Sequence, residues 1–186
     1  MRLEEIRIGS NNPRRVQDVS DLVRSIREQG LLQPVLVRPL PEGGYQVVAG
    51  ERRVRAAREA GLEEVPALVV EADDAEAYLM ALAENAARSD MHPLEKAEAF
   101  LKAVALRAGK GREEVLEAAR RLRSLLGNYG RDWLERARSE PLFPAFAEVS
   151  EAAGIGLTYF LKRLYPFLLI PEERRALYLE AKPPVA

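Results

Sequence analysis

Three arginines follow a glycine and a glutamate in the segment Gly50-Glu51-Arg52-Arg53-Val54-Arg55. A short apolar run ends at this glycine, and a helical pattern begins directly after it. Glycine at such a strand-to-helix turn lets the backbone approach a ligand closely, and the first N–H groups of a helix have no partner within it. A helix start of this kind attracts anions, and arginines beside it add full positive charge. The segment therefore predicts a phosphate-binding turn.

A second candidate group is Glu84, Asn85 and Arg88. A carboxylate and an amide oxygen side by side are ligands that suit Mg²⁺. Arg88 follows Glu84 by four residues, which places both side chains on one face of a helix. The alternative is an ordinary surface ion pair, which stabilises a helix by about 0.2–0.5 kcal/mol. Beside a phosphate-binding turn, the pair is interpreted as part of a pocket for a metal-bound phosphate.

Composition limits the classes of function. The chain has 186 residues, 47% of them hydrophobic and 31% charged, which suits one large or two small folded domains. The absence of cysteine excludes disulfides, thiol nucleophiles and thiolate zinc sites. The single histidine, His92, leaves little histidine-based chemistry and is expected to cap or pack a helix. No apolar run approaches the roughly 20 residues of a membrane span, so we expect a cytoplasmic protein without a membrane partner.

Charge is unevenly distributed along the chain. The net charge is -1, which argues against indiscriminate binding to nucleic acid. Residues 107–138, however, hold nine basic and five acidic side chains. This local excess predicts contact with DNA phosphates through Arg120, Arg121 and Arg123. The alternative is a solvated helix that carries internal ion pairs, and the charge pattern alone leaves both open.

The pattern of apolar residues changes near residue 90. Residues 1–90 mix short strands with helices, which predicts a small α+β domain whose sheet is covered on at least one face. Strands are expected at 6–8, 34–39, 45–49 and 65–70, with a hairpin between the second and third, and helices at 19–29, 51–60 and 73–88.

Residues 91–186 predict an all-α domain. Helices are expected at 93–107, 112–126, 131–139, 146–153 and 157–164, with a last one that begins at Pro171. The segment 146–164 has the shape of a degenerate helix-turn-helix, in which early residues of the second helix contact base edges. Its candidates are Thr158, Tyr159, Lys162 and Arg163. The second helix is also strongly apolar, so a purely structural role stays open.

Five segments in order resemble the N-terminal domain of ParB-type plasmid and chromosome partition proteins. They are Ser25-Ile26, Gly30 to Val35, Tyr45 to Ala57, Val65-Pro66 and Glu84-Asn85-Ala86-Ala87-Arg88, and Asp90 to Ala97 is similar to that family's junction with its helical DNA-binding domain. The resemblance covers about residues 6 to 100. It implies a sulfiredoxin-like domain that binds CTP with Mg²⁺, in a homodimeric clamp that loads at a centromere-like DNA site. A ParA-type ATPase is the implied protein partner.

The resemblance also assigns residues. The first phosphate motif falls on Gly50, Glu51, Arg52, Arg53 and Arg55, the second on Glu84, Asn85 and Arg88, and base recognition on Gln33. Glu84 and Asn85 would then hold Mg²⁺. Glu51 is expected to hold a neighbouring arginine, with a role as general base as the alternative.

Two departures from the family pattern stand out. A glutamine implicated in hydrolysis has no counterpart in register, because Asn12-Pro13 runs directly into Arg14-Arg15-Val16-Gln17. Nucleotide binding is therefore better supported than CTPase activity. About 40 residues of basic helix precede the helix-turn-helix, and the family's C-terminal dimerisation domain has no counterpart, which indicates a short form or a fragment.

Two other functions compete with a partition protein. The fold also resembles sulfiredoxin, whose chemistry is excluded because it needs a cysteine, and free-serine kinases, which would make the chain an ATP- or ADP-dependent phosphotransferase with Glu51 as base. A nucleotide-independent DNA-binding adaptor would keep the helices and tolerate the loss of Arg52. The basic helical half favours a DNA partition factor, since an enzyme acting on a small molecule does not need it.

Overall fold

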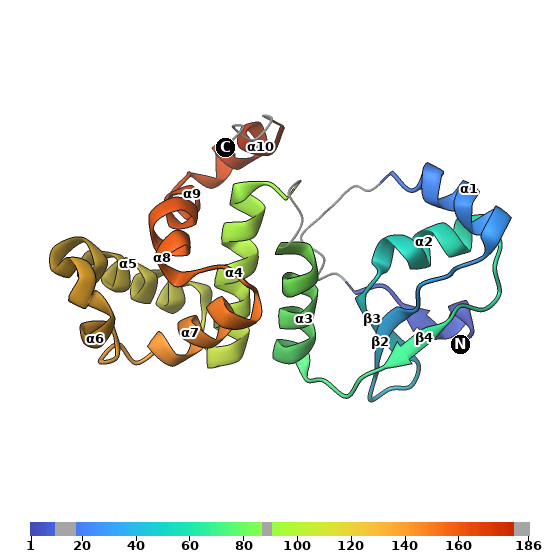
Figure 1. The fold of residues 1–186 in the computed structure, drawn as a ribbon, viewed down its shortest axis with the longest axis horizontal. Helices are drawn as coiled ribbons and strands as arrows, with labels where there is room; N and C mark the ends of the chain where they lie inside the picture. The colour runs from blue at the N-terminus through green and yellow to red at the C-terminus, as the bar shows by residue number, and fades with distance from the viewer. Residues whose placement is uncertain (10–17, 87–90, 181–186) are drawn as a thin grey trace. The chain divides into compact units, whose positions relative to one another are not determined.

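The computed structural model describes residues 1–9, 18–86 and 91–180 (Figure 1). The chain forms two compact units, Met1–Ala81 and Leu82–Ala186. The division falls inside a helix, α3 (Asp74–Ala86), so the predicted boundary at residue 90 lies beyond it.

The first unit is built on a four-stranded mixed sheet. Its strands are β1 (Ile6–Arg7), β2 (Val35–Pro39), β3 (Tyr45–Ala49) and β4 (Ala67–Val69), with a 3₁₀ turn, η1 (Leu3–Glu5), before the first. The order across the sheet is β1-β3-β2-β4. β2 and β3 form the predicted antiparallel hairpin, whereas β1 pairs with β3 and β4 pairs with β2 in parallel. The mixed α/β class predicted for this part is confirmed.

Two helices cover the sheet in successive layers. α2 (Glu51–Ala60) lies between the sheet and α1 (Ser20–Gln29), as Figure 1 shows. Val54 on α2 packs with Val35 of the sheet in one core cluster, and Ala56 on the other side of α2 packs with α1. All three side chains are fully buried. α2 is therefore held on two sides, which fixes the position of its first turn.

An arginine fastens the start of α3 to the hairpin. Arg38 donates from Nε and Nη2 to Gln46 Oε1 at 2.9 and 2.7 Å, and from Nη1 to the Ala72 carbonyl at 3.2 Å. It also pairs with the carboxylate of Asp74. The side chain of Arg38 is only 12% exposed, and each of its nitrogens donates a hydrogen bond. Nothing in the local sequence of β2 distinguishes this arginine from a surface one.

The described part of the second unit is helical throughout. Its elements after α3 are α4 (Pro93–Ala108), α5 (Arg112–Tyr129), η2 (Gly130–Asp132), α6 (Trp133–Ala137), α7 (Phe143–Ala152), α8 (Leu157–Tyr159), η3 (Phe160–Leu164), α9 (Tyr165–Leu168) and α10 (Glu172–Glu180). None of the helices in these described segments combines the length and apolar composition that a bilayer crossing requires.

Several predicted helix bounds in this unit are wrong. α5 continues through Gly127, because a single glycine costs a helix only about 1 kcal/mol and the buried Leu126 directly before it anchors this turn. The helix expected at 131–139 is a 3₁₀ turn followed by the short α6. α7 begins at Phe143 rather than 146, since Pro144 lies in the first turn, where a missing N–H has no cost.

Other predictions for the helical unit are confirmed. His92 caps α4: its Nδ1 accepts from the Leu94 N–H at 3.1 Å, while Glu95 accepts from the His92 N–H at 3.1 Å. Trp133 is buried, as expected of a core residue. The centre of the core is an aromatic cluster of Phe100, Phe146 and Phe160, in which the Phe100 and Phe160 rings stack with centroids 4.1 Å apart.

Candidate functional site

The turn between β3 and α2 requires glycine at position 50. Gly50 has φ 94° and ψ 26°, in the left-handed region that side chains disfavour. A Cβ atom here would also lie 3.2 Å from the Arg53 guanidinium carbon and from a Val35 methyl group. The first helical hydrogen bond of α2 runs from the Val54 N–H to the Gly50 carbonyl at 3.1 Å, and no side chain caps the helix. The predicted strand-to-helix turn, with an open helix start, is confirmed.

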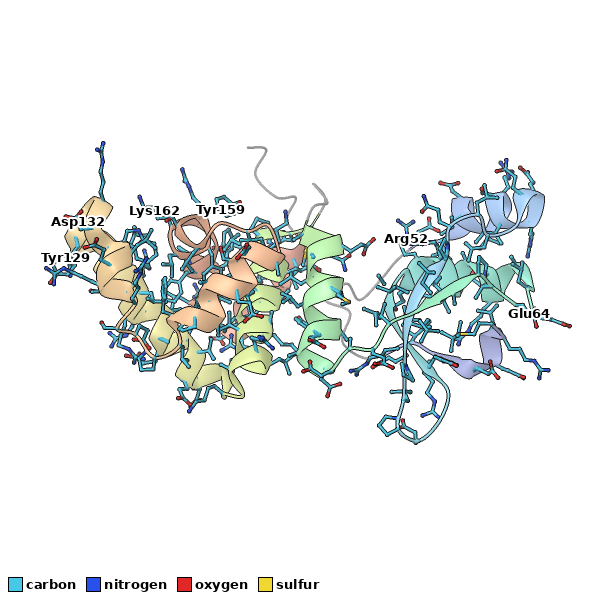
Figure 2. The ribbon with its side chains drawn as sticks, turned by 60° about the horizontal axis from the view of Figure 1, so that its bottom comes forward. Arg52, Glu64, Tyr129, Asp132, Tyr159 and Lys162 are labelled. Atoms are coloured by element: carbon cyan, nitrogen blue, oxygen red, sulfur yellow. The ribbon has the colours of Figure 1, made fainter. Side chains whose placement is uncertain are left out.

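Arg52 lies on the first turn of α2 (Figure 2). Its Nη2 donates to the main-chain carbonyl of Asp18 at 2.8 Å. Its Nε is buried and has no hydrogen-bond partner among the described residues. A buried charged donor without an acceptor is costly, and buried polar groups are almost always paired. The guanidinium is therefore held in place with one N–H left for an acceptor that the described residues do not provide.

Arg53 contacts the loop before β2. Its Nη1 donates to the carbonyls of Gln33 and Pro34 at 3.4 and 2.6 Å. Arg53 therefore ties the loop before β2 to the start of α2. The Gln33 side chain itself is exposed at this loop. The sequence grouped the arginines as equal phosphate ligands, whereas the structure makes Arg53 a link between the loop and the turn.

Arg55 pairs with Glu51 along the surface of α2. Its Nε and Nη2 donate to Glu51 Oε1 at 2.9 and 2.6 Å, and the Glu51 carboxylate is only 12% exposed. The expectation that Glu51 holds a neighbouring arginine is confirmed. The pair also keeps the carboxylate compensated next to a turn that attracts anions.

Asp18, whose carbonyl accepts from Arg52, also belongs to the site, and the sequence pattern did not predict it. Its carboxylate accepts from the N–H and the hydroxyl of Ser20 at 2.9 and 2.7 Å, which shapes the start of α1. These two hydrogen bonds, and then the charge of Arg52, lower the pKa of the Asp18 carboxyl below its ordinary value. The only local signal is an acidic residue two positions before a serine, which is typical of a helix start.

The predicted metal ligands belong to the second compact unit, whereas the Gly50 turn belongs to the first. Glu84 and Asn85 are on the last part of α3, which belongs to the second compact unit, and Glu84 is exposed. Arg88 and the segment with Gln17 lie outside the described residues. Within the described segments no three His, Cys, Asp or Glu side chains gather as a metal site. Mg²⁺ ordinarily keeps several waters and takes phosphate oxygens as ligands, so one carboxylate and one amide still fit it.

The arginines predicted to contact DNA from α5 are largely engaged within the protein. Arg120 pairs with Glu117 at 2.7 Å, and Arg121 makes a bidentate pair with Glu140 at 2.7 and 2.9 Å. The Arg123 guanidinium lies 5.2 Å from the centre of the Tyr165 ring. For Arg120 and Arg121 the structure favours the ion-paired helix that the sequence left open.

The residues predicted to meet base edges share an exposed surface. Thr158, Tyr159, Lys162 and Arg163 are all exposed, on α8 and the π-helical turn η3. Phe160, Leu161 and Leu164, on the same turns, are buried. The apolar residues therefore form the core side, and the polar candidates are left on the outside. The π-helical turn itself was not predicted; such turns are frequent at functional sites.

We expect Glu140→Gln to destabilise the protein by about 1.5–3 kcal/mol at about pH 7, the usual range for a lost hydrogen bond to a charged group. The Arg121 hydrogen bonds lower the pKa of Glu140 from 4.5. The stabilisation is therefore present above that value and lost as the pH falls through the lowered pKa. Urea unfolding at about pH 7 and about pH 4 should show a difference from the native protein that shrinks on acidification.

The control is Glu148→Gln, because Glu148 pairs with Arg107 at 2.8 Å but is 46% exposed. This exposed pair should contribute about 0–1 kcal/mol. An equal effect of both substitutions at both pH values would contradict the role given to the Glu140 pair.

Comparisons with known proteins agree with the resemblance. Residues 1–86 match the model of the ParB N-terminal domain. The probable plasmid-partitioning protein ParB of Thermus thermophilus is 39% identical over 178 residues, which cover 94% of this chain and 58% of that protein. The chromosome-partitioning protein Spo0J of Thermus thermophilus is 45% identical over 129 residues, covering 68% of this chain and 47% of that protein. The chain thus spans about half the length of these relatives.

Among solved structures, the C-terminally truncated ParB of Caulobacter crescentus complexed with CTP-gamma-S is 32% identical, with a TM-score of 0.45, over 87% of this chain and 97% of that one. The same truncated protein complexed to the centromeric parS site is 30% identical with a TM-score of 0.45, over 97% of this chain and 98% of that one. By this match, residues 1–86 belong to the ParB N-terminal domain family, and most of the chain is similar to named partition proteins.

Proposed function

We propose that this protein is a CTP-responsive, DNA-binding partition factor. Its first unit binds CTP with Mg²⁺ at the Gly50 turn, and its helical unit binds a centromere-like DNA site. It acts as a homodimeric clamp alongside a ParA-type ATPase. The observation that carries the proposal is Arg52: a guanidinium fixed at an open helix start, with a buried Nε that has no acceptor among the described residues.

The residues of the turn divide the work of binding a triphosphate. The free N–H groups of α2 and the Nε of Arg52 would donate to phosphate oxygens. Arg53 would hold the loop at Gln33, whose amide has the donor and acceptor needed to pair with a pyrimidine edge. Glu84 and Asn85 would hold Mg²⁺, which neutralises phosphate charge when bound. Hydrolysis of CTP is not part of the proposal.

Arg88 would connect the nucleotide pocket to the helical unit, so that nucleotide binding changes the position of the helices. Support comes from α3, which carries Glu84 and Asn85 and spans the division between the two units. Arg38 and Asp74 fasten the other end of this helix to the sheet.

DNA binding is proposed for the helix-turn-helix formed by α7 and the α8–η3 segment. Support comes from the tight turn between them, in which Gly154 has φ 64° and the Ser150 hydroxyl donates to the Ile155 carbonyl at 2.8 Å. The exposed residues of α8–η3 would face the major groove, with Lys162 and Arg163 as donors to base edges or phosphates. The buried aromatic residues of the same segment fix its orientation.

The test is calorimetric titration of the full chain with CTP, ATP, GTP and UTP, each with Mg²⁺. We expect CTP alone to bind. Binding of ATP or ADP instead would favour the phosphotransferase with Glu51 as base. No binding of any nucleotide, together with intact DNA binding, would favour the nucleotide-independent adaptor, whose arginine turn contacts another anion.

A further inference from the structure

The basic side chains of residues 107–138 fall into two groups. Those of the first group each form an ion pair with a glutamate within 4.0 Å: Arg107, Lys110, Arg112, Arg120 and Arg121. Those of the second group have no carboxylate partner among the described residues: Arg123, Arg131, Arg136 and Arg138. Lys162 and Arg163 on η3 share this property. The net charge of residues 107–138 does not distinguish the ion-paired basic side chains from those without a carboxylate partner.

The two groups differ in what they offer to a phosphate. A paired arginine has some of its donors occupied and brings a carboxylate close to any approaching anion. An arginine without a carboxylate partner offers its planar fork, which matches phosphate geometry. The paired group begins at the end of α4 and extends into the middle of α5, whereas the second group begins at Arg123 and continues through α6.

An exposed tyrosine accompanies the second group. Tyr129 is 42% exposed, and the Arg136 guanidinium lies 4.1 Å from the centre of its ring. Stacking on the ring orients the guanidinium and leaves its N–H edge free to donate. The buried Trp133 and Ala137 anchor α6 beneath these side chains. Asp132 and Glu135 lie in the same segment, so the surface is basic without being uniformly so.

This surface continues into the proposed DNA-reading segment. α5 packs against η3, and Arg123 on α5 lies over Tyr165, the residue directly after η3. Figure 2 shows the labelled Tyr129 and Asp132 on the same side of the helical unit as Lys162 and Tyr159. The segment around Tyr129 and the α8–η3 segment, far apart in sequence, therefore lie along one side of the helical unit.

We propose that Arg123, Tyr129, Arg131, Arg136 and Arg138 form a second DNA-backbone contact, which we name the flanking surface. It would bind phosphates beside the base pairs that α8–η3 reads and so lengthen the DNA site covered by each subunit. The inference rests on the proposed DNA-binding function. It assigns the DNA-phosphate contact of this segment to side chains that have no carboxylate partner among the described residues, in place of the ion-paired Arg120 and Arg121.

The test measures the affinity of the full chain for a DNA duplex of arbitrary sequence, about 40 base pairs long, over a range of salt concentrations. The variant combines Arg131→Ala, Arg136→Ala and Arg138→Ala, and the matched control combines Arg107→Ala, Arg112→Ala and Arg120→Ala. Both change the charge equally. Each lost phosphate contact lowers the slope of log affinity against log salt by about 0.9. We expect a slope reduced by about 2–3 in the variant and little changed in the control.

Equal slopes for the variant and the control would overturn the flanking surface. A third protein, with Lys162→Ala and Arg163→Ala, tests the proposed DNA-binding function separately from the flanking surface. If the native chain binds DNA and this double variant weakens it, the DNA-binding function stands whatever the triple variant does. If the native chain does not bind this duplex even at low salt, the flanking surface is overturned, and binding to a centromere-like site is the test of the proposed DNA-binding function. Circular dichroism of each variant checks that the helices are retained.

Discussion

Arg52→Ala is expected to lower the affinity for magnesium-bound CTP by about 10- to 100-fold. The substitution removes a positive charge and a donor from the start of α2, and a hydrogen bond to a charged group contributes about 1.5–3 kcal/mol. A factor of ten in affinity corresponds to about 1.4 kcal/mol. The Nε of Arg52 has no acceptor among the described residues, so a phosphate oxygen placed there would add a hydrogen bond.

The fold should survive this substitution. Among the described residues, the Arg52 side chain donates a single hydrogen bond, to the Asp18 carbonyl. The packing of α2 depends instead on Val54 and Ala57 against the sheet, and on Ala56 against α1. An unchanged circular dichroism spectrum would therefore accompany the loss of binding in a calorimetric titration.

Two further variants sharpen the result. Arg52→Lys keeps the charge but loses the planar fork, and it should recover only part of the affinity. Arg24→Ala removes an equal charge from the exposed surface of α1 and should leave affinity unchanged. The nucleotide proposal would be wrong if Arg52→Ala bound CTP as tightly as the native chain does.

Phe160→Ala should destabilise the helical unit by about 3–5 kcal/mol, the usual cost of removing a buried phenylalanine. Phe160 is fully buried and stacks on Phe100, and it also packs near Phe146. Its loss removes a ring that α4, α7 and η3 share, so the cavity cannot close by the movement of one side chain. Such a cost is a large fraction of the roughly 5–15 kcal/mol that stabilises a typical protein.

The matched control is Tyr159→Ala, one residue earlier on the same helical segment. Tyr159 is 53% exposed, so its removal should change stability by no more than about 0.5 kcal/mol. Urea unfolding measures both variants. DNA affinity separates them further: Tyr159→Ala should weaken DNA binding in a stable protein, if this segment contacts DNA. Similar unfolding midpoints for the two variants would contradict the packing role of Phe160.

The strand-to-helix turn at Gly50 is the feature that the sequence predicted best. A glycine between an apolar run and a helix already specifies a strand-to-helix turn, because few other residues tolerate its backbone angles. The cap of α4 was also predictable from neighbouring residues. His92 and Glu95 accept hydrogen bonds from backbone N–H groups within one turn of chain, and Pro93 suits the first helical position. The hairpin of β2 and β3 likewise depends on neighbouring residues.

Helix bounds were less predictable where packing overrides local preference. Gly127 lies inside α5, and Pro144 opens α7 instead of interrupting the chain before it. The π-helical turn at Phe160–Leu164 had no local signal. Gly127 and the π-helical turn are accommodated because buried residues such as Leu126 and Phe160 stabilise conformations that the isolated segment would not favour. Pro144 instead follows the local rule that proline suits the first turn of a helix.

The sequence by itself determined where the charged side chains gather, and the tertiary structure decided which of them are available. Arg52 meets the carbonyl of Asp18, 34 residues earlier, and Arg121 meets Glu140, 19 residues later. Glu98 accepts from Arg112 and from Arg175, which are 14 and 77 residues away. Charge and spacing are local properties of the chain, whereas the partner of a charge depends on which distant segments pack beside it. Only that packing separates an arginine that holds the fold together from one that can bind a ligand.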